Sequence, residues 1–293
     1  MSAPQQLETT DATEDRAFAF VRALAEELSK GKVELPGFPD VAIRVQRVLA
    51  DENVTPDRIV RVIGSEPVLA GRLLQMANSV ALNVTGKPVT DLRTAVTRVG
   101  INIVRSATIA FAIQQLRRAP ALRGLEKPLD VLWQRSVQVA SLCHVIAKRL
   151  THLSPDTAML AGLLHGIGRL YILTRAGKHR ALFSDVATYQ AIEREWHLTI
   201  AVALLENWEI ADEIVQAVRD SADMEREVRG SPCLGDVLMA SMIIAQYQNN
   251  PAELEANLQK AKAVQRLQLT PAVCEQILRE AAEEIAALRA ALG

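Results

Sequence analysis

Aromatic side chains are scarce in this sequence. Phe, Trp and Tyr make up 4% of the 293 residues, which leaves little surface for stacking nucleic-acid bases. The formal net charge is −1, so the chain has no overall positive field to attract phosphates. We therefore expect no nucleic-acid partner. A local basic cluster (Arg117, Arg118, Arg123 and Lys127) is expected to be a solvated loop.

Cysteines and targeting signals are also sparse. Cys143, Cys233 and Cys274 are far apart and form neither a CxxC metal clip nor an even disulfide set. We expect them to be small buried residues in a reducing compartment. The first residues lack the basic start and apolar core of a signal peptide. No apolar run is expected to reach the ~20 residues of a membrane span. These absences indicate a cytoplasmic protein without a membrane partner.

Alternating apolar and polar residues, the pattern of half-buried strands, are nearly missing. Helix starts are present instead: Thr55-Pro56, Ser154-Pro155 and Thr270-Pro271 each place a capping hydroxyl before a proline. Asp91 is predicted to cap a short helix, and Gly100 to end it. An apolar share of 49% is enough for a large core. The sequence predicts an all-α protein.

Composition divides the chain into four parts. Residues 1–14 form a polar, disordered tail; residues 15–120 an N-terminal helical half; residues 121–225 a second helical half; and residues 226–293 a C-terminal helical extension. Helices are expected from about Leu129 to Leu150 and, after a polar connector over 178–190, from about His197 to Trp208. The last helix, from Pro271, should pack along another helix or along a second copy in a homodimer.

The stretch Ala161–Leu170 carries His165 among apolar residues and three glycines. A helix that places His beside an acid can direct two donors at one cation, but Gly166 follows His165 and offers no side chain. His197 is the most plausible second ligand, and two histidines without a carboxylate make a weak site. The three glycines are expected to serve helix packing, and His144 to be a core residue.

Other catalytic templates are missing from the sequence. It contains no GxSxG, GxxxxGK[ST] or HExxH motif, and no GxGxxG after a strand. Several spaced motifs nevertheless occur in a distinctive order: Leu35–Pro39, Ser65–Ala70, Leu73–Ser79, Ala95–Gly100, Trp133–Ser136 and Ala161–Gly168. In this order they resemble the HDOD family, the HD-related output domain of bacterial signalling proteins, over roughly residues 30–225.

The resemblance implies a multi-helix HD-like fold, with an N-terminal helical subdomain packed on a degenerate HD-like subdomain. It implies relatedness to HD metal-dependent phosphohydrolases, without their complete metal site. When the family's motif positions are carried over to this sequence, its HD pair falls on His165 and Gly166. Its upstream histidine falls on Arg135. His197 is kept, and the late ligand region offers Asp220. These positions would form a vestigial site, in which Arg135 would instead hold an anion.

The residues and the resemblance together predict a non-catalytic signal-transduction module without metal or cofactor. It would act through protein-protein interaction with a signalling partner in trans. The alternative is a metal-dependent phosphohydrolase or phosphodiesterase that uses His165 on nucleotides or cyclic dinucleotides. A third possibility is ligand sensing without hydrolysis.

Overall fold

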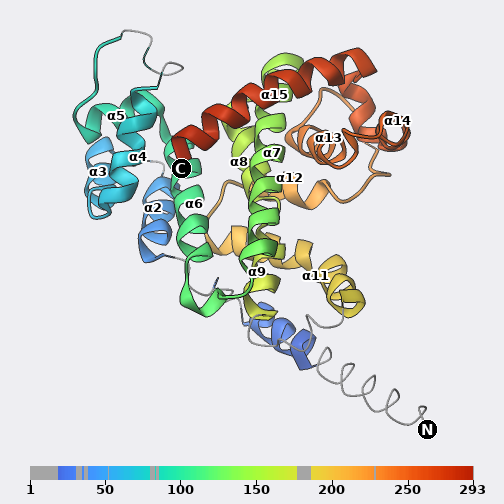
Figure 1. Ribbon diagram of the computed structural model, residues 1–293, viewed down its shortest axis with the longest axis horizontal. Coiled ribbons are helices and arrows are strands. Elements are labelled where there is room, and N and C mark those ends of the chain that lie inside the picture. Colours follow the sequence, from blue (N-terminus) through green and yellow to red (C-terminus); the bar gives the residue numbers. More distant parts are fainter. Residues whose placement is uncertain are drawn as a thin grey trace.

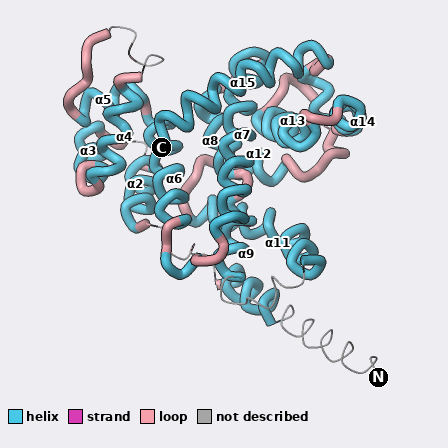
Figure 2. The backbone as a smooth tube through the Cα atoms, viewed as in Figure 1, coloured by secondary structure: helices cyan, strands magenta, loops and turns pink. Residues whose placement is uncertain are grey.

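Every regular element in the described part of the chain is a helix. The computed structural model describes residues 19–30, 35, 39–51, 53–79, 83, 86–176, 186–227 and 229–292. No strand occurs within those ranges, and Figure 2 shows helices joined by loops. The all-α prediction is therefore confirmed. The tail predicted for residues 1–14 lies outside the described residues.

The N-terminal helices surround a shared apolar core. Residues 19–29 are helical, and α2 to α6 follow them: α2 (Asp40–Ala50), α3 (Pro56–Ile63), α4 (Pro67–Ala77), α5 (Leu92–Val99) and α6 (Ile101–Arg117). Figure 1 shows α3, α4 and α5 grouped at one end of the molecule. Gly100 has a φ of +82°, and the chain turns by 107° between α5 and α6. Gly100 thus ends α5 as predicted, because glycine adopts this backbone conformation without a steric penalty.

The middle of the chain is organised around one long helix. Its elements are η1 (Pro120–Leu122), α7 (Glu126–Leu150), α8 (Pro155–Leu164), α9 (Ile167–Ala176), α11 (Val186–Asn207) and α12 (Asp212–Asp220). Helix α8 packs along α7, and α9 packs on α11. The turn at His165 and Gly166 separates α8 from α9, so the apolar stretch of the sequence is two helices.

The last part of the chain packs back onto α7. Its elements are α13 (Leu234–Tyr247), α14 (Pro251–Lys260), η2 (Lys262–Leu267) and α15 (Pro271–Leu292). Helix α15 contacts α7, α6 and α4, and it crosses the top of Figure 1 from the α13 and α14 side toward α4. The prediction that the last helix packs along another helix is confirmed. Packing on a second copy stays a prediction.

Two of the three hydroxyl-proline helix starts are capped as predicted. The hydroxyl of Ser154 accepts a hydrogen bond from the backbone N–H of Thr157 at 3.2 Å, and that of Thr270 accepts one from Val273 at 3.3 Å. The prediction was wrong for Thr55, whose side chain makes no such bond. Pro56, which fixes φ in the first turn of α3, begins that helix without a side-chain cap.

Two sequence-based expectations about length need correction. Helix α11 begins at Val186, so residues 186–190 are helix and His197 lies in its middle, whereas the sequence suggested a start near His197. Ile192, Trp196 and Ile200 form its inward stripe, which the charged residues between them obscure in the sequence. The apolar stretch Pro155–Arg175 also reaches membrane-spanning length, with 21 residues, but 89% of its apolar window is buried inside the protein.

Candidate functional site

His165 lies in the turn between α8 and α9 and is 5% exposed. Its Nδ1 is 2.6 Å from the carbonyl oxygen of Gly162, so Nδ1–H donates to that oxygen and Nε2 keeps the free lone pair. Burial, together with the positive charges of Arg169 and Arg135 and the nearby His197, lowers the pKa of His165 to about 4. His165 is therefore neutral at physiological pH, and it is a buried, hydrogen-bonded residue.

Gly166 occupies the position where an acidic ligand would stand. A Cβ atom built there would lie 3.3 Å from the hydroxyl of Ser136 and would meet no backbone atom closely. The backbone geometry therefore tolerates a side chain at Gly166, and only Ser136 would have to adjust. The cavity beside these two residues is about 10 Å³, which is room for one water. No acidic side chain is present at this position, and this cavity holds at most a water.

Two guanidinium groups stand near the histidine. Arg135, on α7, is partly buried, and that burial together with the charge of Arg169 lowers its pKa. Arg169, on α9, pairs with Glu193 of α11 through Nε and Oε1 at 2.7 Å. Within the described part of the chain, Arg135 makes no hydrogen bond or ion pair. The surroundings of His165 therefore include one paired and one unpaired cation.

His197 faces the same region from the middle of α11. Its Nδ1–H donates to the carbonyl oxygen of Glu193 at 2.7 Å. Burial, followed by the charge of Arg169, lowers the pKa of His197 as well. Arg135 and His197 both influence the pKa of His165, so the structure brings these residues together from α7, α11 and the turn between α8 and α9.

The glycines flanking His165 permit two close helix contacts. A Cβ at Gly168 would lie 1.8 Å from the carbonyl oxygen of His197, and a Cβ at Gly162 would lie 2.5 Å from the Cα of Ala140. Both distances are impossible for real atoms, so α9 and α11, like α8 and α7, touch backbone to backbone. The packing role predicted from sequence is confirmed for Gly162 and Gly168. Gly166 has no comparable contact.

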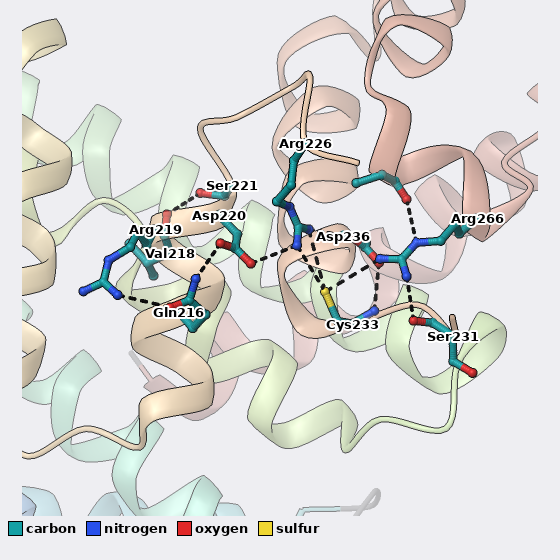
Figure 3. A network of polar contacts seen from close by, with 11 residues as sticks. Gln216, Val218, Arg219, Asp220, Ser221, Arg226, Ser231, Cys233, Asp236 and Arg266 are labelled. Carbon is teal, nitrogen blue, oxygen red and sulfur yellow. Dashed lines mark hydrogen bonds and ion pairs between the residues drawn. The ribbon is translucent and has the colours of Figure 1, made fainter. Parts of the chain in front are cut away.

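Asp220 belongs to a different polar cluster, drawn in Figure 3. Its carboxylate accepts hydrogen bonds from Arg226 at 2.9 Å and from Gln216 at 2.6 Å. Arg226 also pairs with Asp236 at 2.6 Å, and Arg266 of η2 binds the same carboxylate. Asp236, at 0% exposure, is fully surrounded by these partners.

Cys233 lies at the edge of this cluster, with its sulfur 3.7 Å from Arg226 and 3.9 Å from Arg266. It is partly exposed, which corrects the expectation that all three cysteines are buried. Cys143 and Cys274 are buried as predicted.

A divalent metal does not fit the residues around His165. Across the described ranges, no three His, Cys, Asp or Glu side chains are grouped so that they would hold a metal ion. His165 and His197 each have a lone pair at Nε2, but the guanidinium groups of Arg135 and Arg169 influence them, and the carboxylate that influences His197, Glu193, is paired with Arg169. Cations repel a metal, and two neutral imidazoles without a carboxylate bind one weakly.

Comparison with known proteins places this arrangement in a family. Residues 35–224 match the family described as HDOD domain. The chain belongs to that family. A provisionally assigned metal-dependent phosphohydrolase from Shewanella amazonensis SB2B has a similar structure, with a TM-score of 0.72 and 25% identity over 95% of this chain and 100% of its own.

A second solved structure shares the fold. It is an HDOD domain protein of unknown function from Geobacter sulfurreducens, with a TM-score of 0.61 and 24% identity, covering 95% of this chain and 97% of the other. An uncharacterised protein of Treponema pallidum (strain Nichols) is 20% identical over 236 residues, which are 75% of this chain. The chain spans only 44% of the length of that relative.

Sequence reasoning missed Arg169 and Glu193. A local signal existed for Glu193, because it precedes His197 by four residues in α11, which places the two on one helix face. The cluster in which Arg226 and Arg266 bind Asp236 (the Asp236 cluster) gave no local signal in the sequence. Its members come from three segments that meet only in the folded chain.

Proposed function

We propose that this HDOD domain is a non-catalytic signalling module that binds a signalling protein in trans through its helical surface. One observation carries the proposal: His165 is a neutral, buried residue that donates to Gly162, with glycine in the acid's place and arginines as its charged neighbours. The carboxylate beside this set, that of Glu193, is paired with Arg169, so it is not available to hold a cation or to take a proton from water. The residues around His165 stabilise the junction between α8 and α9, and the outer helices are left to recognise the partner protein. A cytoplasmic location is part of this proposal.

The alternative is a metal-dependent phosphohydrolase acting on nucleotides or cyclic dinucleotides. The similarity to the Shewanella protein supports testing it. The full chain would be incubated with Mn²⁺, freed of excess ion and analysed for bound metal, then assayed on bis(p-nitrophenyl) phosphate and on a cyclic dinucleotide. We expect neither stoichiometric metal nor turnover.

Two variants make this experiment decisive. His165→Ala removes the retained histidine, and His152→Ala removes an exposed histidine as a matched control. Stoichiometric metal and turnover that His165→Ala abolishes and His152→Ala preserves would establish the enzyme. A second pair tests the cause: if the missing acid and the arginine are what exclude metal, the double variant Arg135→His with Gly166→Asp should bind Mn²⁺ more tightly than the parent.

Anion sensing is a second candidate function, supported by Arg135. A partly buried guanidinium without a hydrogen bond or ion pair among the described residues is a natural partner for a phosphate. Calorimetric titration with phosphate-bearing nucleotides would compare the parent with Arg135→Gln. Binding heat that the variant lacks would support sensing, and no heat with the parent would exclude it.

A further inference from the structure

A large groove lies in the C-terminal extension, outside the family match and away from His165. Its volume is about 850 Å³, and it opens between α14, η2 and the start of α15. Figure 1 shows α14 at the edge of the molecule opposite α3. The volume is within the range of about 300–1,000 Å³ that is typical of binding pockets.

The groove has apolar walls. They are formed by Leu254 and Leu258 of α14, Val264 of η2, Leu269 of the connection, and Cys274 and Leu278 of α15. The apolar side chains therefore come from two helices, α14 and α15, and from the segment that connects them. An apolar channel between helices is the geometry that receives the apolar face of another helix.

The rim of the groove has charge of one sign. Glu255 and Glu275 line it, and none of the described lining residues is lysine or arginine. Glu275 has an ion pair with Arg279 at 3.8 Å, in which both side chains are more than 70% exposed, so that pair is weak and leaves the carboxylate available. Glu255 accepts one hydrogen bond, from Gln259 at 3.2 Å.

Four glutamines complete the rim, namely Gln248, Gln259, Gln265 and Gln268. Their amides donate and accept hydrogen bonds, and they suit a polar peptide edge. An anionic ligand such as a nucleotide or a fatty acid would meet two carboxylates and no cation among the lining residues.

The polar cluster of Figure 3 holds one wall of the groove in place. Arg266 of η2 binds the buried carboxylate of Asp236 and donates to the carbonyl oxygens of Ser231 at 2.8 Å and Gly230 at 3.2 Å. These bonds fix η2, and with it Val264, against α13. The groove is therefore preformed, which lowers the ordering cost of binding.

We propose that this groove binds an amphipathic helix of a partner protein, one whose apolar face is flanked by lysine or arginine. The inference rests on the proposed function, because it names the surface and the chemistry of the partner. The apolar face would cover Leu269 and Leu278, which are partly exposed beside the buried Leu254 and Leu258. The flanking cations would pair with Glu255 and Glu275.

The test uses the full chain and two synthetic helices. One is an amphipathic helix of leucine and lysine, and the other replaces every lysine with glutamate. Fluorescence anisotropy would measure their binding to the parent and to the double variant Glu255→Lys with Glu275→Lys. We expect the parent to bind the lysine helix and not the glutamate helix, and the variant to bind the lysine helix about tenfold more weakly.

A control variant matches the change in net charge. Glu195→Lys with Glu213→Lys alters two exposed residues on α11 and α12 that do not line the groove. It should bind the lysine helix as the parent does. Equal weakening by both double variants, equal binding of both helices, or no binding of the lysine helix would each overturn the proposal. Because these measurements need no metal and no phosphoester, turnover in the earlier assay would overturn the proposed function without changing their outcome.

Discussion

At the scale of single residues, the burial of His165 makes the folded chain less stable at low pH. Its pKa is lowered to about 4 in the folded chain, below the value of about 6.5 in an unfolded chain. The unfolded chain therefore binds more protons as the pH falls. The stabilisation is complete above about pH 6.5 and is lost as the pH falls toward about 4. The lowered pKa of His197 acts in the same direction.

We predict that the free energy of unfolding falls between pH 7 and pH 5, with His165 contributing about 2 kcal/mol. His165→Gln removes the titrating group, so its unfolding free energy should depend less on pH, as measured by urea denaturation at several pH values. His152→Gln, an exposed control, should keep the dependence of the parent. An unchanged dependence in His165→Gln would show that other groups cause it.

The contact of Gly168 with α11 gives a second prediction at the scale of single residues. Gly168→Ala forces a methyl group into the carbonyl oxygen of His197, so we expect a loss of about 3 kcal/mol as α9 and α11 separate. Gly71→Ala is the control, since a Cβ there meets nothing within 4 Å. It should stabilise the chain by about 0.5–1 kcal/mol. Thermal unfolding of both variants measures the contrast, and similar values would refute the close contact.

At the scale of elements, local signals predicted helix ends well and helix partners poorly. Asp91 caps α5 by accepting a hydrogen bond from Thr94 at 2.8 Å, and Gly100 ends that helix, because both effects act within a few residues. The start of α11 was missed, since the charged residues of its outer face obscure its buried stripe. Asp220 could be matched to a family position. Its pairing with Arg226 could not be predicted, because it depends on the path of the folded chain between the two residues.

The Asp236 cluster supplies the prediction for this scale. Asp236→Asn removes the buried charge that binds Arg226 and Arg266, and leaves two largely buried guanidinium groups without it. We expect a loss of about 3 kcal/mol, because breaking a buried ion pair strands its partners. Glu206→Gln, which breaks the exposed pair with Arg219, should change stability by less than about 0.5 kcal/mol. Chemical denaturation would compare them, and equal effects would contradict the role of burial.

At the scale of the whole molecule, α15 connects distant parts of the fold. Among its described side chains, Cys274, Ile277 and Ala281 are buried, with 2%, 0% and 2% exposure, and the helix contacts α7 and α4. The family resemblance ends before this helix, so the sequence could predict an amphipathic segment but not which helices it would cover.

We predict that truncation after Thr270 speeds amide exchange in α7 and α4, because both lose their cover. Residues 19–29, which are held by the pairing of Glu27 with Arg175 at 2.6 Å, should exchange as before. Hydrogen exchange with mass spectrometry measures this. If the truncated chain does not fold, Ile277→Ala tests the same contact, with an expected loss of about 2–4 kcal/mol. Unchanged exchange and stability would show that α15 is dispensable.

The position of α15 also has a mechanical consequence. One end of this 22-residue helix forms a wall of the C-terminal groove, and the helix continues from there to the neighbourhood of α4. At 1.5 Å per residue it is a rod about 33 Å long. A tilt of about 5° at the groove would move the far end by about 3 Å. A lever of that length converts a small local adjustment into a displacement large enough to repack side chains at the other end of the protein.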